Sequence, residues 1–322
     1  MNRGLLYEDK FRPQFSGHET FPLRYGWLKK VFDDVYELEK QGQKSDAKDL
    51  FLNDDAIARF GVGKNMVASM RHWATSSNII AEDDDKDIIT TDLAKLILAD
   101  KGLDPWMENV SSIWAVHWHL ATSSSKATYI WLFSHFNNNQ FDRGAIVQHL
   151  FNVCEDRSWK TASMSTLKRD VECLVRTYVN KPSKTDDFTE DQIESPLAEL
   201  GLIQPVNKND IFQIKRGPQP SLNSGVFLYA LIDFWKRYTN TSRTLSLETI
   251  VYEPCSPGRV FCLDEDAIAG RLYNIEKASG GILTWSETAG LRQVIANKPL
   301  EEIDAFQFLK NDYEKKTYRK AA

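Results

Sequence analysis

The segment from Phe15 to Lys30 holds the densest group of side chains that could take part in chemistry. His18 can exchange a proton near neutral pH, Glu19 can act as a general base or bind a metal ion, and Arg24 can hold a phosphate. These three are the candidate catalytic residues, and Glu19 is the candidate ligand for Mg²⁺ or Mn²⁺. The alternative is structural: the segment leads into a helix capped by Thr20, and His18 is a buried core residue.

The turn Gly61–Asn65 is followed by apolar residues at helical spacing. It is not a phosphate-binding loop, because that loop needs a glycine where Ala58 stands and a serine or threonine where Asn65 stands. The pattern indicates the start of a DNA-recognition helix through Thr75, or a helix whose polar face is only solvated. The candidate DNA-contacting residues of this helix are Lys64, Asn65, Ser69, Arg71 and His72.

A second basic face lies between residues 160 and 184, where six lysines and arginines accompany two acidic residues. Such a face would neutralise DNA phosphates and release counterions, whereas the commoner alternative is a solvated helix held by charge pairs four residues apart. The candidates here are Lys160, Lys168, Arg169 and Arg176. Lys215 and Arg216 after a predicted hairpin, and Arg259 in a stiff turn, complete the candidate DNA-binding set.

Side-chain patterns of other enzyme classes are weak or absent. His117 and His119 lie two residues apart, so on a helix they point in different directions and are poor joint metal ligands. The sequence contains no complete His-Asn-His nuclease pattern, no Gly-x-Ser-x-Gly and no dinucleotide-binding glycine pattern. These absences argue against hydrolases and dehydrogenases of the common types.

A unit of helix, tight turn, helix and hairpin recurs three times along the chain. The first copy, about residues 51–100, has predicted helices over 54–60 and 64–75, strands at 78–80 and 88–90, and a further helix capped by Asp92. The second copy, about 141–217, has helices after Asp142 and Ser165 and a hairpin over 202–215. The third copy, about 245–297, ends in a hairpin over 282–295. We interpret these units as winged helices.

Aromatic-rich helical segments at 113–136 and 226–238 join the units as packing struts. We therefore expect a mainly α fold of the α+β class, with several winged-helix or helix-turn-helix modules. The expected domains are an N-terminal helical region (1–50), a first winged helix (51–105), a helical connector (106–140), a second winged helix (141–217) and a C-terminal helical or winged-helix-like domain (218–322).

Composition restricts the class of protein. The 322 residues carry a net charge of −5, with 42% apolar and 26% charged residues, which is typical of a globular protein. The four cysteines form no Cys-x-x-Cys pair, which fits a reduced compartment. There is neither an apolar run long enough to cross a bilayer nor an apolar signal core, so we expect a cytoplasmic protein that contacts no membrane.

Several of these segments, in this order, resemble a known protein family. They are Phe15–Trp27, Gly61–Met66 with Arg71 and Trp73, Thr166–Val171, Ser195–Leu197, and Ser256–Gly258 with Phe261. The chain is similar to the uncharacterised-domain proteins encoded beside DNA phosphorothioation genes, a family that includes the nicking subunit of the single-stranded system. The resemblance spans nearly the whole chain, to about Gln293.

The resemblance implies a component of bacterial defence by DNA modification that opens one strand of duplex DNA, so that a partner can replace a phosphate oxygen with sulfur. The partners that it implies are a cysteine desulfurase and ATP-using subunits. Cleavage would need a divalent ion or a general base, and a cation to stabilise charge on the phosphate. Two alternatives remain open: a non-catalytic DNA-binding regulator or targeting subunit, and a scaffold that docks protein partners, which the acidic balance and nine tryptophans favour.

Overall fold

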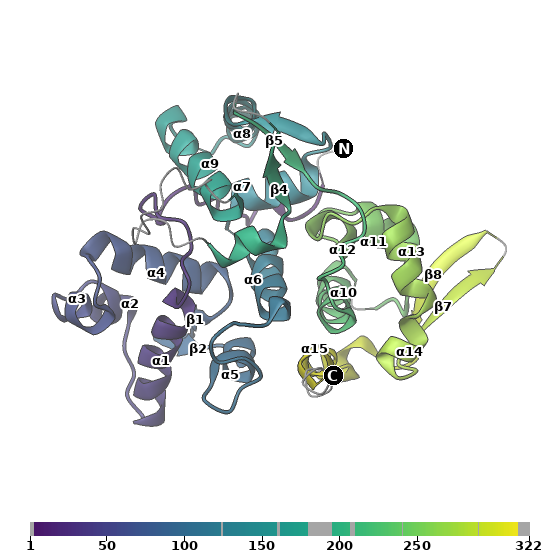
Figure 1. Ribbon diagram of the computed structural model, residues 1–322, viewed down its shortest axis with the longest axis horizontal. Coiled ribbons are helices and arrows are strands. Elements are labelled where there is room, and N and C mark those ends of the chain that lie inside the picture. Colours follow the sequence, from purple (N-terminus) through teal and green to yellow (C-terminus); the bar gives the residue numbers. More distant parts are fainter. Residues whose placement is uncertain are drawn as a thin grey trace, which may run out of the picture.

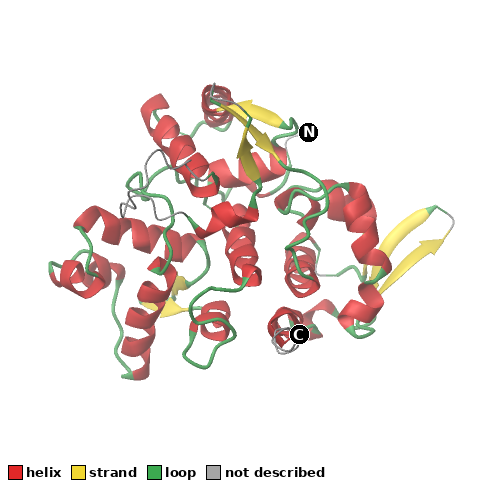
Figure 2. Cartoon of the chain, in the orientation of Figure 1, coloured by secondary structure: helices red, strands yellow, loops and turns green. Residues whose placement is uncertain are grey.

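The computed structural model describes residues 3–123, 125–159, 162–179, 195–206, 210–239, 241–288 and 290–314. Helices dominate, and the strands form three small, separate antiparallel sheets (Figure 1, Figure 2). The predicted α+β class is confirmed. Candidate Lys160 lies outside the described residues.

The first part of the chain contains α4, the helix that was expected to contact DNA. A short 3-10 turn, Leu5–Tyr7, precedes an irregular segment that runs to Gly26. Helix α4 packs against α1 and turns Val67, Met70 and Trp73 inward, as its apolar spacing predicts. The elements are α1 (Trp27–Lys40), α2 (Ala47–Phe51), α3 (Asp55–Phe60), α4 (Lys64–Ser76), β1 (Ile80–Glu82), β2 (Ile88–Thr90) and α5 (Asp92–Leu98).

The middle of the chain places a second pair of helices beside a three-stranded sheet. Gly201 takes a φ of +62° and ends the 3-10 helix η4, a position that glycine occupies without steric cost. The elements are α6 (Val110–Thr122), α7 (Ala127–Ile130), a π-helical turn (Trp131–His135), β3 (Gln140–Asp142), α8 (Arg143–Asp156), α9 (Met164–Tyr178), η4 (Pro196–Leu200), β4 (Ile203–Pro205) and β5 (Ile211–Ile214).

The C-terminal part packs on α6 through two long helices. α6 and α10 are almost entirely buried and contact each other and α15, so they are the packing struts that the aromatic-rich segments predict (Figure 1). The elements are α10 (Ser224–Tyr238), β6 (Thr244–Ser246), α11 (Leu247–Tyr252), α12 (Pro257–Val260), α13 (Glu265–Tyr273), α14 (Ile275–Ser279), β7 (Leu283–Thr288), β8 (Leu291–Ala296), a 3-10 turn η5 (Leu300–Glu302) and α15 (Ala305–Glu314). None of the helices in the described ranges is both long and apolar enough to cross a membrane.

The three predicted units share one arrangement of strands. In each hairpin the second strand, or the residue beside it, pairs with a short segment that precedes the helices: Asp46 bridges Asp87 next to β2, β3 pairs with β5, and β6 pairs with β8. The last residue of that segment also caps the next helix, namely Asp46 for α2, Asp142 for α8 and Ser246 for α11. The repeated unit is therefore a feature of the topology. Its identification as a winged helix, and the domain boundaries, stay predictions.

Some local expectations differ from the structure. Thr91 rather than Asp92 caps α5, because a capping side chain must stand just before the first helical residue. The helix expected after Ser165 begins at Met164, and Ser163 caps it. The proposed helix lead-in capped by Thr20 is wrong, since α1 begins only at Trp27. The expected strut over 113–136 is interrupted between α6 and α7.

Candidate functional site

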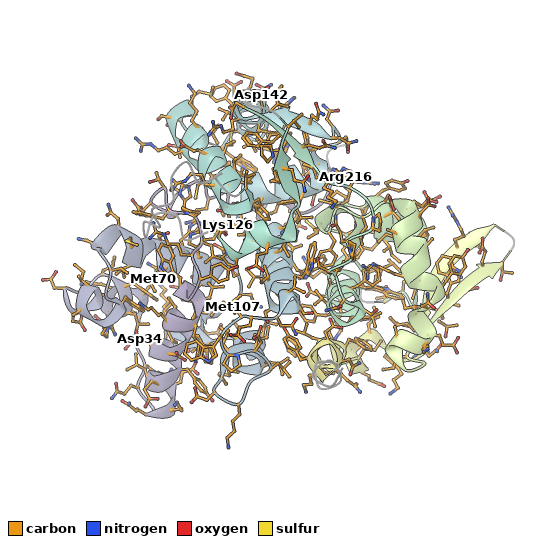
Figure 3. The ribbon with its side chains drawn as sticks, in the orientation of Figure 1. Asp34, Met70, Met107, Lys126, Asp142 and Arg216 are labelled. Carbon is orange, nitrogen blue, oxygen red and sulfur yellow. The ribbon has the colours of Figure 1, made fainter. Side chains whose placement is uncertain are left out.

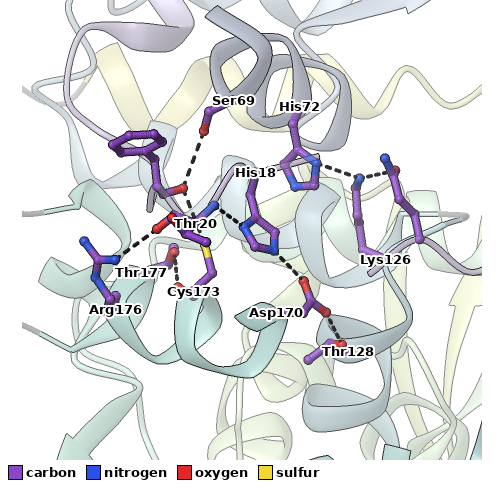
Figure 4. A network of polar contacts seen from close by, with 12 residues as sticks. His18, Thr20, Ser69, His72, Lys126, Thr128, Asp170, Cys173, Arg176 and Thr177 are labelled. Carbon is purple, nitrogen blue, oxygen red and sulfur yellow. Dashed lines mark hydrogen bonds and ion pairs between the residues drawn. The ribbon is translucent and has the colours of Figure 1, made fainter. Parts of the chain in front are cut away.

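The segment around His18 lies between α4 and α9, the two helices that carry most of the candidate DNA contacts (Figure 4). The carbonyl oxygen of Phe21 accepts a hydrogen bond from Trp73 Nε1 of α4 at 3.0 Å and lies 3.4 Å from Cys173 Sγ of α9. Arg176 of α9 donates to the carbonyl oxygen of Thr20 at 3.0 Å. One stretch of backbone therefore links two helices that are far apart in the sequence.

His18 points into this junction and is only 4% exposed. Its Nδ1 accepts a hydrogen bond from the Thr20 amide at 2.9 Å, so its proton lies on Nε2. Nε2 is 3.1 Å from Asp170 Oδ1, at an angle that does not make a straight hydrogen bond. Asp170, also 4% exposed, accepts a hydrogen bond from the hydroxyl of Thr128. This buried imidazole–carboxylate contact holds the N-terminal segment against α9.

His72 of α4 joins the same network from the other side. Its Nδ1 lies 3.3 Å from Lys126 Nζ, and its ring meets the His18 ring edge-on with 5.6 Å between centroids. Lys126, well inside the outline of the molecule in Figure 3, also donates to the side-chain oxygen of Gln14. Burial, followed by the charge of Lys126, lowers the pKa of His72 well below its usual value, so this imidazole is neutral.

Lys126 makes the stability of this junction dependent on pH. Burial lowers its pKa to about 8, and the negative charge of Asp170 partly opposes that effect. The folded chain therefore holds this proton less tightly than the unfolded chain, in which the pKa of lysine is about 10.4. The cost of burying the charge is fully present below about pH 8 and is relieved as pH rises toward about 10.4.

We predict that the wild type gains about 2–3 kcal/mol of stability relative to Lys126→Met between about pH 7 and about pH 10. The variant is the reference because other groups that titrate in this range affect both proteins alike. Urea unfolding of the two proteins at both pH values measures the difference. A difference that does not change with pH would show that Lys126 keeps its proton throughout this range.

Glu19 and Thr20 form a turn that residues other than glycine rarely adopt. Their φ angles are +46° and +66°, in the left-handed region. The amide of Phe21 donates to the His18 carbonyl oxygen at 2.8 Å, which closes the turn. The side chain of Glu19 is left exposed beside the junction. Left-handed residues that the surrounding structure holds in place occur often at functional sites.

The candidate residues differ in exposure. His18, Ser69 and His72 are buried, and Ser69 lies 3.5 Å from the carbonyl oxygen of Phe21. The half-buried candidates are Arg24, Arg71, Arg176, Arg216 and Arg259. The exposed candidates are Glu19, Lys64, Asn65, Lys168, Arg169 and Lys215. The structure thus brings His18, Ser69, His72 and Arg176 together in one junction and leaves the remaining lysines at the surface.

Most of the half-buried arginines already hold structural contacts. Arg216 and Arg259 both donate to the carbonyl oxygen of Phe136, at 3.0 and 2.9 Å. Arg71 lies over the ring of Phe51. By contrast, Lys64, Lys168 and Arg169 form no ion pair with any residue of the described ranges.

Sequence reasoning missed several members of the polar network around His18. Gln14, Lys126 and Thr128 were not candidates. Asp170 was considered only as one of the two acidic residues in the basic segment 160–184. One signal existed: Lys126 interrupts an aromatic-rich stretch, where a buried charge is costly unless it is paired. The partner of that charge lies on another helix, so no local pattern identifies it.

Carboxylates that could hold a divalent ion cluster elsewhere in the described part of the chain. Asp83, Asp85 and Asp87, in the β1–β2 turn, place ligand oxygens within 4.8 Å of one another, and Glu19 is not among them. The ammonium of Lys44 lies 3.0 Å from Asp85 and 3.3 Å from Asp87. Oxygen donors of this kind suit Mg²⁺, so the group fits a hydrated divalent ion, for which Lys44 is a competing cation.

A model of a protein family described as protein of unknown function (DUF4007) matches residues 15–313. The chain belongs to this family. The matched range begins at the segment that carries His18 and ends within α15, so it includes His18, His72, Lys126 and Asp170.

Two solved structures are similar to the DUF4007 chain over almost its full length. The magnesium ion-bound crystal structure of SspB has a TM-score of 0.82 and 26% sequence identity, and the match covers 99% of this chain and 93% of that chain. A second SspB crystal structure has a TM-score of 0.80 and 27% identity, over 98% and 92% of the two chains. No curated protein matches the sequence. The predicted family resemblance is therefore confirmed.

Proposed function

We propose that this protein is a DNA-binding subunit of a bacterial DNA phosphorothioation system and that it nicks one strand so that sulfur can be incorporated. The similarity to SspB supports a role in such a system. A cysteine desulfurase and ATP-using subunits are the partners that this role requires. The observation that carries the DNA contact is the exposed pair Lys168 and Arg169 on α9.

The outward face of α9 is basic in a protein that is acidic as a whole. Asp170 is turned inward and contacts His18, so its negative charge does not offset the positive charge of this outward face. Lys168, Arg169 and Arg176 then stand against the single exposed carboxylate of Glu172. A local excess of cations on a protein of net charge −5 attracts phosphates where the overall charge does not.

The start of α4 extends the same interface. Lys64 and Asn65 are exposed in its first turn, where unpaired backbone N–H groups also favour a phosphate. The segment through Thr20 and Phe21 bonds to both helices and so ties α4 to α9. Two basic faces that are linked in this way could contact phosphates on one duplex at the same time.

We predict that Lys168→Ala/Arg169→Ala weakens binding to duplex DNA about tenfold and lowers the slope of log K against log [salt] by about 2. The reason is that each lost phosphate contact removes the release of about one counterion. Fluorescence anisotropy with a labelled duplex over a salt series measures both quantities.

Lys277→Ala/Lys298→Ala is the matched control, since it removes the same charge from two other exposed lysines. It should leave the slope unchanged. Equal effects of the two double variants would mean that only the net charge of the protein matters. If Lys168→Ala/Arg169→Ala binds duplex DNA as tightly as the wild type, α9 is not part of the interface.

A non-catalytic targeting subunit is the second candidate function. The burial of His18 favours it, because an imidazole that is 4% exposed and held by Asp170 cannot reach DNA without movement of the segment. In this case the protein would bind duplex DNA with the same salt dependence but would leave supercoiled plasmid intact, alone or with its partner subunits.

A further inference from the structure

The third repeated unit differs from the first two in the charge of its main helix. The first unit presents Lys64 at the start of α4, whereas α13 follows Asp264 and opens with Glu265 and Asp266. The cation of α13 is turned inward, since Arg271 donates to the carbonyl oxygens of Gln219 and Leu222 and lies over the Phe227 ring. The outward side of α13 is therefore acidic.

Large apolar and aromatic side chains are exposed beside this acidic helix. Leu291 is 66% exposed, Tyr273 63% and Tyr252 55%. They come from β8, α13 and α11, which contact one another within the third unit. The acidic residues at the start of α13 interact favourably with the positive end of its helix dipole. That interaction does not explain why these three apolar and aromatic side chains are exposed.

Two of the exposed rings are held in place by carboxylates. The Tyr252 hydroxyl donates to Glu265 at 3.0 Å, and the Tyr273 hydroxyl donates to Glu287 at 3.3 Å. The Tyr273 ring also meets the Trp285 ring edge-on, at 5.9 Å between centroids. Tyrosine rings that are already ordered lose little entropy when a partner covers them, and a ring beside a carboxylate suits a lysine or arginine side chain.

The hairpin that carries Leu291 projects from the body of the molecule. Its strands, β7 and β8, have six residues each, and in Figure 1 they extend beyond α13 and α14. Arg292, a cation of this hairpin, is engaged by Glu265 at 2.7 Å. Neighbouring residues of a strand point to opposite faces, so Leu291 lies on the other side of the hairpin from Arg292 and Glu287. On the α13 side, an incoming chain would thus meet the two tyrosine rings and the carboxylates.

We propose that this face, formed by Tyr252, Glu265, Tyr273 and Glu287, docks a partner protein that presents lysine or arginine next to an apolar side chain, which would pack on the tyrosine rings. Its acidic charge repels the phosphates of DNA, so the third unit serves protein contact while α4 and α9 serve DNA. Aromatic side chains at the centre of an interface commonly supply most of its binding energy.

The test uses a fluorescein-labelled peptide of alternating arginine and leucine, and a control peptide in which glutamate replaces arginine. The full chain should bind the basic peptide in a salt-sensitive manner and should not bind the acidic one. Tyr252→Ala/Tyr273→Ala should weaken binding of the basic peptide about tenfold. Thermal unfolding of each variant shows whether it is folded at the assay temperature.

Two matched variants separate this face from general attraction to an acidic protein. Tyr238→Ala removes another exposed tyrosine, and Glu301→Gln/Glu302→Gln removes two exposed carboxylates elsewhere. Both should keep wild-type affinity for the peptide, whereas Glu265→Gln/Glu287→Gln should lower it. Absence of peptide binding, or equal losses in all variants, would overturn the proposal. A loss of duplex binding in Tyr252→Ala/Tyr273→Ala without peptide binding would assign the face to DNA instead.

Discussion

Replacing Glu19 by glutamine is expected to lower the rate at which the protein converts supercoiled plasmid to nicked circles by about 100-fold or more. Glu19 is the one acidic side chain of the Phe15–Lys30 segment, and it is exposed beside the basic faces of α4 and α9. A carboxylate there can take a proton from the attacking water or hold a divalent ion. A bound ion would supply positive charge to the scissile phosphate.

The other candidate side chains of the segment should behave differently from Glu19. Arg24 lies over the rings of Phe21 and Trp27 at its surface, where it can contact a phosphate, so Arg24→Gln should also slow nicking. His18 is buried and fixes the turn, so His18→Gln should lower stability together with activity. Glu301→Gln, a change of an exposed carboxylate on η5, serves as the control.

The same assay locates a metal ion if one is required. Activity that is lost with a chelator and restored by Mg²⁺ or Mn²⁺ is expected, and Asp85→Asn tests the carboxylates near Lys44 against Glu19. A larger loss in Asp85→Asn than in Glu19→Gln would move the ion to the β1–β2 turn. If Glu19→Gln nicks plasmid as fast as the wild type, this carboxylate takes no part in the chemistry. If the wild type nicks no plasmid with any metal or partner, the non-catalytic targeting function is the one supported.

Local periodicity was sufficient to predict most helices but not what lies between them. The stripe of Val67, Met70 and Trp73 predicts α4 over 64–75, and the structure has it over Lys64–Ser76. The strands β3 and β6 were not predicted, because three residues carry too little pattern and exist only through pairing with distant hairpins.

The candidate site was harder to predict for a related reason. The polar residues Ser69 and His72 were assigned to a solvent-facing side of α4, yet both are buried against the N-terminal segment. A helical pattern shows which side carries apolar residues, but it does not show whether a second surface covers the polar side. The contact of His18 with Asp170 joins positions that no local rule connects.

The repeated unit explains how one chain can present different surfaces. Its strands and capping residues recur three times, while the exposed side chains on α4, α9 and α13 change from basic to acidic. Packing residues fix the topology, and the outward residues are free to vary because they contribute little to stability. Function therefore has to be inferred unit by unit rather than from the fold that the units share.

The buried junction between these units gives the largest expected effect on stability. Asp170→Ala should lower the free energy of unfolding by about 3–5 kcal/mol, because it removes a buried carboxylate on which three other buried polar groups depend. The change leaves the Thr128 hydroxyl without its acceptor, and it leaves His18 Nε2 and the charge of Lys126 without the nearby carboxylate. Urea unfolding at neutral pH measures the difference.

Glu172→Ala is the matched control, because this carboxylate lies two residues further along α9 and is exposed. Its effect should stay within about 0.5 kcal/mol. His18→Ala combined with Asp170→Ala should cost less than the sum of the single changes by about 1–3 kcal/mol, since both remove the same contact. Equal stabilities of the Asp170 and Glu172 variants would show that the junction does not hold α9 in place. A destabilised Asp170→Ala that keeps the wild-type salt slope for DNA would show that α9 binds DNA without support from the N-terminal segment.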